Sequence, residues 1–117
     1  AAETGVATIS IADILTGIVT ITHSVGATVA LTLDTGTLMD AGRPSLMKTD
    51  EALDWTLINL SAAAADTATV TAATGHTLVG TMICQSAHAS IGGVQGNAIR
   101  LRSRRTAANT WVTYRLG

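Results

Sequence analysis

The chain has 117 residues, a formal net charge of −1 and a composition dominated by small side chains. This length is typical of one domain, and no linker-like segment divides residues 1–117. Ala and Thr supply about a third of the residues, whereas charged residues supply 13%, against about 25% in ordinary soluble domains. No run of 18 apolar residues and no secretory signal peptide is visible, so we expect neither a membrane partner nor export. The surface of such a chain is expected to lie largely against protein rather than water.

Alternation with a period of two residues dominates the chain. In residues 28–33, Thr or Ala alternates with Val or Leu, which predicts a strand with one apolar face. Residues 55–60 are largely apolar on both faces, as in a strand buried between two layers. About eight short strands are predicted, at residues 18–22, 28–33, 55–60, 67–72, 77–79, 81–85, 97–104 and 110–116. Turn signals about every ten residues favour a β-sandwich or barrel over alternating strands and helices.

Two short helical turns are predicted between the strands. Ser10 can cap a helix over residues 11–16, which Gly17 would end. Residues 34–41, followed by glycine, are the second candidate. Each helix is at most two turns long and therefore needs packing to be stable. The proline-containing segment 42–50 and the glycine-rich segment 92–96 are predicted loops.

The last twenty residues are predicted to form a β-hairpin with one basic face. Small or apolar residues alternate with Arg100, Arg102 and Arg104, so the three arginines share one face of their strand. Residues 105–109 are the predicted loop. In the second strand, Trp111 and Arg115 lie on the same face, where Arg115 is expected to be half-buried by its aliphatic stem.

The charges are segregated along the chain. All eight acidic residues lie in residues 1–66, where only Arg43 and Lys48 oppose them, which gives this part a net charge of −6. Residues 67–117 hold five arginines and no acid, a net charge of +5. The overall charge of −1 therefore hides a strongly polar distribution.

Three hypotheses can account for the arginines. A nucleic-acid surface is disfavoured because the chain is net acidic and poor in aromatic residues. The arginines can instead pair with acids of the same chain on a solvated strand face, or with acids of a neighbouring copy or a host surface. Both of these hypotheses stay open, although the use of Arg without any Lys favours an interface, because Arg binds carboxylates in bidentate fashion. The candidate interface residues are Arg100, Arg102, Arg104, Arg105 and Arg115.

No constellation of catalytic or metal-binding residues is visible. His23, His76 and His88 are far apart and show none of the short spacings of a metal motif. Ser86 and His88 share a face of one predicted strand, but nothing marks an oxyanion hole or an orienting group. Cys84 is the only cysteine and is expected to be a small core residue. We therefore expect a protein that is not an enzyme and that uses no metal or cofactor.

Several segments, taken in order, resemble a known family. They are residues 12–20 (ADILTGIVT), 32–38 (TLDTGTL), 58–61 (INLS) with the alanines that follow, 66–71 (DTATVT), 74–80 (TGHTLVG) and 105–116 (RTAANTWVTYRL). In this order they are similar to the small jelly-roll decoration, or cement, proteins of tailed bacteriophage capsids. The fold that the resemblance implies is all-β, a single jelly-roll-like antiparallel β-sandwich of about eight short strands with one or two short helical turns.

The resemblance also implies a function. Proteins of this family are usually homotrimers that sit on the outside of the virion at local three-fold positions and clamp neighbouring major capsid subunits. The expected partners are therefore other copies of the chain and the major capsid protein, with no nucleic acid, and the chain would be made in the host bacterial cytoplasm. The alternative is a carbohydrate- or receptor-binding module of a phage tail or head fibre. Such a module normally shows aromatic platforms, whereas two of the three aromatic residues here are expected in the core.

Overall fold

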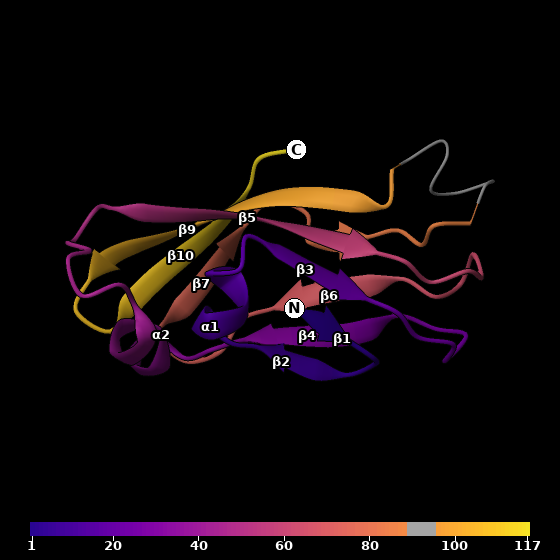
Figure 1. The fold of residues 1–117 in the computed structure, drawn as a ribbon, viewed down its shortest axis with the longest axis horizontal. Helices are drawn as coiled ribbons and strands as arrows, with labels where there is room; N and C mark the ends of the chain where they lie inside the picture. Colours follow the sequence, from indigo (N-terminus) through magenta and orange to yellow (C-terminus); the bar gives the residue numbers. More distant parts are fainter. Residues whose placement is uncertain (89–95) are drawn as a thin grey trace.

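The computed structural model describes residues 1–88 and 96–117, which form two β-sheets and two short helices (Figure 1). The larger sheet has the strand order β1 (Ala2–Glu3), β3 (Ile18–Ile21), β5 (Ala52–Asn59), β9 (Ala98–Ala107), β10 (Thr110–Arg115) and β7 (His76–Val79). The smaller sheet has the order β2 (Ala7–Ile9), β4 (Val29–Leu33), β6 (Ala68–Thr71) and β8 (Ile83–Cys84). The predicted loop at residues 92–96 lies, except for its last residue, outside the described residues.

All eight predicted strands are confirmed as β3 to β10, although their ends differ by a few residues. Strands β1 and β2 were not predicted, because two or three residues are too few to show an alternation. The predicted loop at residues 105–109 is wrong, since β9 continues to Ala107 and only a tight turn separates it from β10. Backbone hydrogen bonds between Arg105 and residues 50 and 51 extend the pairing of β9 beyond the predicted end.

The expectation of purely antiparallel sheets is wrong. The ladders β1–β3, β3–β5, β2–β4, β4–β6 and β7–β10 are parallel, and β5–β9, β9–β10 and β6–β8 are antiparallel. From β1 to β6 the chain alternates between the two sheets. Strands that are neighbours within one sheet are therefore two apart in the chain and run in the same direction. A period of two residues indicates which face of a strand is buried and carries no information about strand direction.

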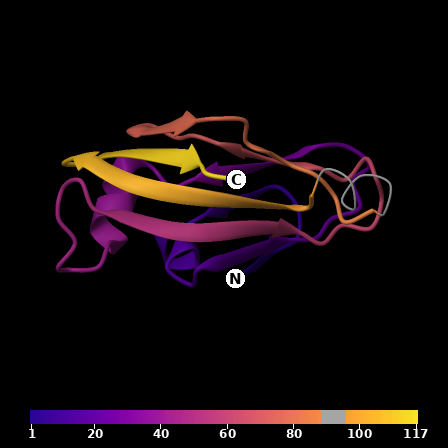
Figure 2. The ribbon, with the colours of Figure 1, turned by 90° about the horizontal axis from the view of Figure 1, so that it is seen from above.

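The core lies between the two sheets and forms one cluster of apolar side chains. Its largest fully buried members are Ile9, Ile14, Val19, Ile21, Leu31, Leu33, Met39, Leu57, Val70, Ile99, Leu101 and Trp111. Trp55 is also buried, so both tryptophans belong to the core, in agreement with the prediction that two of the three aromatic residues lie there. Figure 2 shows β5 and β9, the longest strands, running side by side along the molecule.

Both predicted helices are confirmed as short elements, α1 (Ile11–Ile14) and α2 (Gly36–Gly42). Ser10 caps α1 in a reciprocal capping box with Asp13, and the buried Ile11 and Ile14 attach the helix to the core. The second helix begins two residues later than predicted because Thr35 is its N-cap and accepts a hydrogen bond from the backbone N–H of Leu38.

Candidate interface of the arginine hairpin

The hairpin of β9 and β10 has the basic face that the sequence predicted. Ile99, Leu101 and Ser103 are buried, whereas the intervening Arg100 and Arg102 are exposed and Arg104 is partly exposed. The arginines lie on the outer face of the larger sheet, where β5 supplies the neighbouring side chains.

Arg102 lies directly opposite Asp54 of β5. Its Nε and Nη2 atoms donate hydrogen bonds to the two carboxylate oxygens of Asp54, at 2.6 and 2.9 Å. This bidentate contact lowers the pKa of Asp54 against the opposing effect of burial. Because both side chains are about half exposed, solvent screens the pair and its net contribution to stability is small.

Arg104 is also paired within the chain. Its Nη2 donates to Oδ1 of Asp50 at 2.6 Å, and Asp50 lies in the segment that leads into β5. Contacts with the side chains of Tyr114 and Asp50 raise the pKa of Arg104. This pair too lies largely in solvent, with 66% of the Asp50 side chain exposed.

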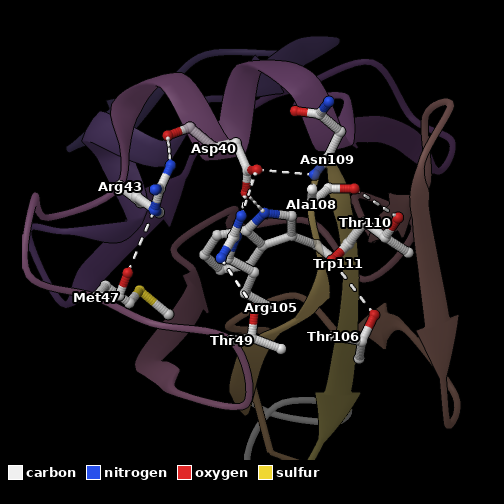
Figure 3. A network of polar contacts seen from close by, with 10 residues as sticks. All are labelled: Asp40, Arg43, Met47, Thr49, Arg105, Thr106, Ala108, Asn109, Thr110 and Trp111. Carbon is white, nitrogen blue, oxygen red and sulfur yellow. Dashed lines mark hydrogen bonds and ion pairs between the residues drawn. The ribbon is translucent and has the colours of Figure 1, made fainter.

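Arg105 belongs to a different environment from the basic face. A register shift between Thr110 and Trp111 places it opposite Trp111, and its guanidinium meets the carboxylate of Asp40 in α2 (Figure 3). The distances are 2.8 Å from Nε to Oδ1 and 3.0 Å from Nη2 to Oδ2. The two side chains are only 13% and 10% exposed.

Asp40 accepts two further hydrogen bonds, so four N–H groups converge on its carboxylate. The indole Nε1 of Trp111 donates to Oδ1 at 2.8 Å, and the backbone N–H of Asn109 donates to Oδ2 at 2.7 Å. The guanidinium of Arg105 is the largest of several contacts that hold the pKa of Asp40 far below its usual range. These contacts join α2 to the turn between β9 and β10, and we call Asp40, Arg105, Asn109 and Trp111 the Asp40 cluster.

Arg43 adds two hydrogen bonds at the same end of the molecule. Its Nη1 donates to the backbone oxygen of Asp40 at 2.7 Å and its Nε to that of Met47 at 3.3 Å (Figure 3). Arg105 also donates to Oγ1 of Thr49 at 3.1 Å. The predicted loop 42–50 is therefore tied to the Asp40 cluster at several points.

The two remaining candidate arginines differ from each other. Arg115 is partly buried, as predicted, and donates hydrogen bonds to the backbone oxygens of Thr81 and Gly117. Arg100 is exposed, and its side chain makes no hydrogen bond or ion pair with residues 1–88 or 96–117. Of the five predicted interface residues, Arg100 is the one whose side chain makes no hydrogen bond or ion pair in the described part of the chain, although its charge, after the contact with Arg102, helps to lower the pKa of the nearby Asp54.

The structure thus gives intrachain acids to Arg102, Arg104 and Arg105, in agreement with one of the two open hypotheses. The acidic first part and the basic last part of the chain neutralise each other across β5, β9 and α2. Pairing within the chain does not exclude contact with a partner, so the interface role of the five arginines stays a prediction.

A second surface was not singled out from the sequence. The outward side chains of the smaller sheet carry no charge on any of its four strands; they are Thr8, Ala30, Thr32, Thr69, Thr71 and Ile83. Hydroxyl contacts join Thr32 to Thr71, at 2.9 Å, and Thr28 to Thr67. We call this surface the threonine face. Its sequence signal is the recurrence of Thr at every second position of residues 67–71, and of Thr or Ala in residues 28–32.

Two of the residues considered for catalysis, Cys84 and Ser86, are buried. Burial raises the pKa of the Cys84 thiol to about 11. The Oγ of Ser86 accepts the backbone N–H of His88. No group of three or more His, Cys, Asp or Glu residues among those described could hold a metal ion. In the part of the chain that the structure covers, no helix has the length and apolar character needed to cross a membrane.

An open depression of about 560 Å³ lies beside His23 at one end of the molecule. His23 Nε2 donates to the backbone oxygen of Thr67 at 2.9 Å, and the backbone N–H of Gly26 donates to Asp66 at 2.7 Å. His23 and Asp66 are both buried and hold the 23–26 segment against residues 66 and 67. These contacts give both side chains a structural role.

The fold and these surfaces define a β-sandwich-like protein with a basic hairpin, three of whose arginines pair with acids, and an uncharged sheet face. No family model, curated protein or solved structure matches the chain.

Proposed function

We propose that this chain is a structural virion protein, not an enzyme, that docks as a homotrimer on the outside of a tailed-phage capsid and cements neighbouring major capsid subunits. The threonine face is the observation that carries the proposal, together with the resemblance of the sequence to capsid decoration proteins. Charged side chains lose hydration when they are buried between proteins, so the centres of protein interfaces are depleted in charge. A whole sheet face without charge fits a surface that another protein covers.

The occupant that we assign to the threonine face is a second copy of the chain. In a trimer the uncharged faces of three copies can meet around the three-fold axis without burying an unpaired ion. The outer face of the larger sheet would instead bring Arg100 and the pairs of Arg102 and Arg104 out of water. In this arrangement the basic hairpin stays available for acids of the capsid surface, with Arg100 as the unpaired cation.

The trimer contact can be tested with a matched pair of variants. Thr69→Lys places a charge on β6, at the centre of the threonine face, and should convert the trimer to monomers in light scattering at tens of micromolar. Thr77→Lys places the same charge at an exposed position of β7 in the other sheet and should leave the trimer intact. A trimer that survives Thr69→Lys would contradict this contact, and a wild-type chain that is monomeric both in solution and on the particle would contradict the trimer.

The capsid role has its own test. The purified chain should bind expanded, DNA-filled particles of the phage that encodes it and not unexpanded ones, as measured by co-sedimentation. Binding to neither particle would refute the cement function, whatever the oligomeric state.

The jelly-roll arrangement belongs to the same proposal. Jelly rolls pair their strands antiparallel, as β5, β9 and β10 do, whereas the ladders among β1 to β6 are parallel. Among the described strands, the part that matches a jelly roll is therefore the antiparallel set β5, β9 and β10. The alternative function, a carbohydrate-binding module, gains no support, because Trp55 and Trp111 are buried and cannot form an aromatic platform.

A further inference from the structure

A continuous chain of hydrogen bonds runs through the buried side of the larger sheet. It starts at the indole of Trp55 in β5, passes through Ser103 in β9 and Thr113 in β10, reaches the imidazole of His76 in β7 and ends at the backbone oxygen of Asp34. The successive distances are 3.0, 2.8, 2.7 and 3.0 Å. All four side chains are at most 3% exposed.

The two ends of this chain fix the direction of every hydrogen bond. An indole N–H can only donate and a backbone oxygen can only accept. Nδ1 of His76 must therefore carry a proton and donate it to the oxygen of Asp34, which leaves Nε2 of the neutral ring as an acceptor. Thr113 then donates to His76 and accepts from Ser103, while Ser103 accepts from Trp55. Each hydroxyl donates once and accepts once. While the His76 ring is neutral, every polar group in this series therefore has a hydrogen-bond partner.

We propose that His76 is an acid-sensitive latch that holds edge strand β7 to the segment joining the smaller sheet to α2 only while its imidazole is neutral. A protonated ring donates from both nitrogens, so Thr113 must turn its own proton toward Ser103. The oxygen of Ser103 then faces two donors, Trp55 and Thr113. The hydroxyl proton of Ser103 has no acceptor left in this series of hydrogen bonds. An unsatisfied donor and a buried charge both disfavour the folded state.

The charged groups around His76 do not stabilise its protonated form enough to offset burial. The residues that follow it in β7 carry no ionisable side chain. Trp111 pairs with His76 in the β7–β10 ladder. It lies opposite Arg105 of β9 and donates to Asp40 of α2, and these two charges neutralise each other. At the far end of β10, Arg115 is bonded to backbone oxygens.

The carboxylate of Asp34 is the anion that favours a charged ring. It already accepts the backbone N–H of Ile11 at 3.1 Å. Burial outweighs this carboxylate and lowers the pKa of His76. The ring is therefore neutral in the folded protein at neutral pH.

The direction of the pH effect follows from the difference in the pKa of His76 between the folded and the unfolded state. In the unfolded chain the pKa of His76 returns to about 6.5, so below that pH the unfolded state binds a proton that the folded state does not. Stability is therefore complete above about pH 6.5 and falls as the pH drops below it. Among the described residues, β7 is an edge strand that pairs only with β10. The loss of stability at low pH should therefore begin as local opening of β7.

Nuclear magnetic resonance of the full chain tests the latch without any substitution. Long-range ¹H–¹⁵N spectra at about pH 7.5 should show His76 as the Nδ1–H tautomer, and a titration should find its ring still neutral at pH values where a free histidine is protonated. Amide exchange, corrected for its intrinsic pH dependence, should accelerate in β7 before β4 as the pH falls. An Nε2–H tautomer, or a ring that titrates like free histidine, would overturn the proposal.

Denaturation with urea supplies the second readout. The fall in the folding equilibrium constant of the wild type between about pH 7.5 and 5 should largely disappear in His76→Gln, which cannot be protonated, and persist in the matched variant His88→Gln. An equal fall in both variants would show that His76 does not control the acid response. If His76→Gln does not fold, the tautomer and titration of the wild type still decide the question.

Discussion

Trp111 donates its indole N–H to the carboxylate of Asp40 at 2.8 Å, across 71 residues of sequence. The same carboxylate holds Arg105 in a bidentate pair and the backbone N–H of Asn109. One small side chain of α2 thus fixes both the end of β9 and the start of β10. The strongest structural effects of substitution are therefore expected at Asp40, away from the exposed arginine face.

Replacing Asp40 by Asn should destabilise the protein strongly. The variant keeps the size of the side chain but leaves the guanidinium of Arg105 without its counter-charge in a site that is mostly shielded from water. Removing one member of a shielded pair leaves the other charge without a partner, so the fall in the free energy of unfolding should be several-fold larger than for an exposed pair. Urea denaturation measures this change, and Asp50→Asn, at an exposed pair, should show a much smaller one. Equal effects in the two variants would contradict the special role of the Asp40 cluster.

Acid should weaken the Asp40 cluster at a lower pH than it weakens the contacts of His76. Arg105 and the other donors hold the pKa of Asp40 far below the unfolded value of about 3.9. At low pH the folded state thus binds fewer protons than the unfolded state. The stabilisation that ionised Asp40 provides is complete above about pH 4 and is lost as the pH falls below that value. Thermal unfolding of wild type and Asp40→Asn should converge toward pH 2. Parallel curves with no convergence would show that Asp40 does not titrate differently in the two states.

Arg100 and Arg102 should respond differently to alanine substitution when docking is measured. Arg102 is already paired with Asp54, whereas Arg100 has no ionic partner among the described residues. Both variants should melt close to the wild type, because both side chains are exposed. Docking on the particle should weaken about tenfold or more for Arg100→Ala and less for Arg102→Ala, as expected when a charge that docking takes out of water is truncated. Unchanged docking of Arg100→Ala would remove the hairpin from the proposed interface.

The thiol of Cys84 should be inert in the folded protein. It is fully buried, and its pKa is raised to about 11, so both access and the thiolate fraction are minimal at neutral pH. A thiol reagent such as dithionitrobenzoate at about pH 8 should react only as fast as the protein opens, and at once in urea. Rapid reaction of the native protein would show that the β6–β8 edge opens far more readily than its packing suggests.

The sequence by itself determined the strand content, the buried faces and both helical turns. These features depend on local patterns: the alternation of residues 28–33, the capping group of Ser10 and the small-and-arginine alternation before Ser103. Each pattern acts within one strand or one turn, where side-chain direction follows directly from backbone geometry. The basic face of the hairpin was predicted for the same reason.

Only the tertiary structure decided which strands pair, in which direction, and which charges meet. Parallel ladders arise because the chain alternates between two sheets, and no residue pattern within a strand records that path. The contact of Asp40 with Arg105 joins residues 65 positions apart, and the buried chain through His76 draws on five separate segments. Such contacts depend on the relative position of elements, whereas the sequence restricts only the side chains available to make them.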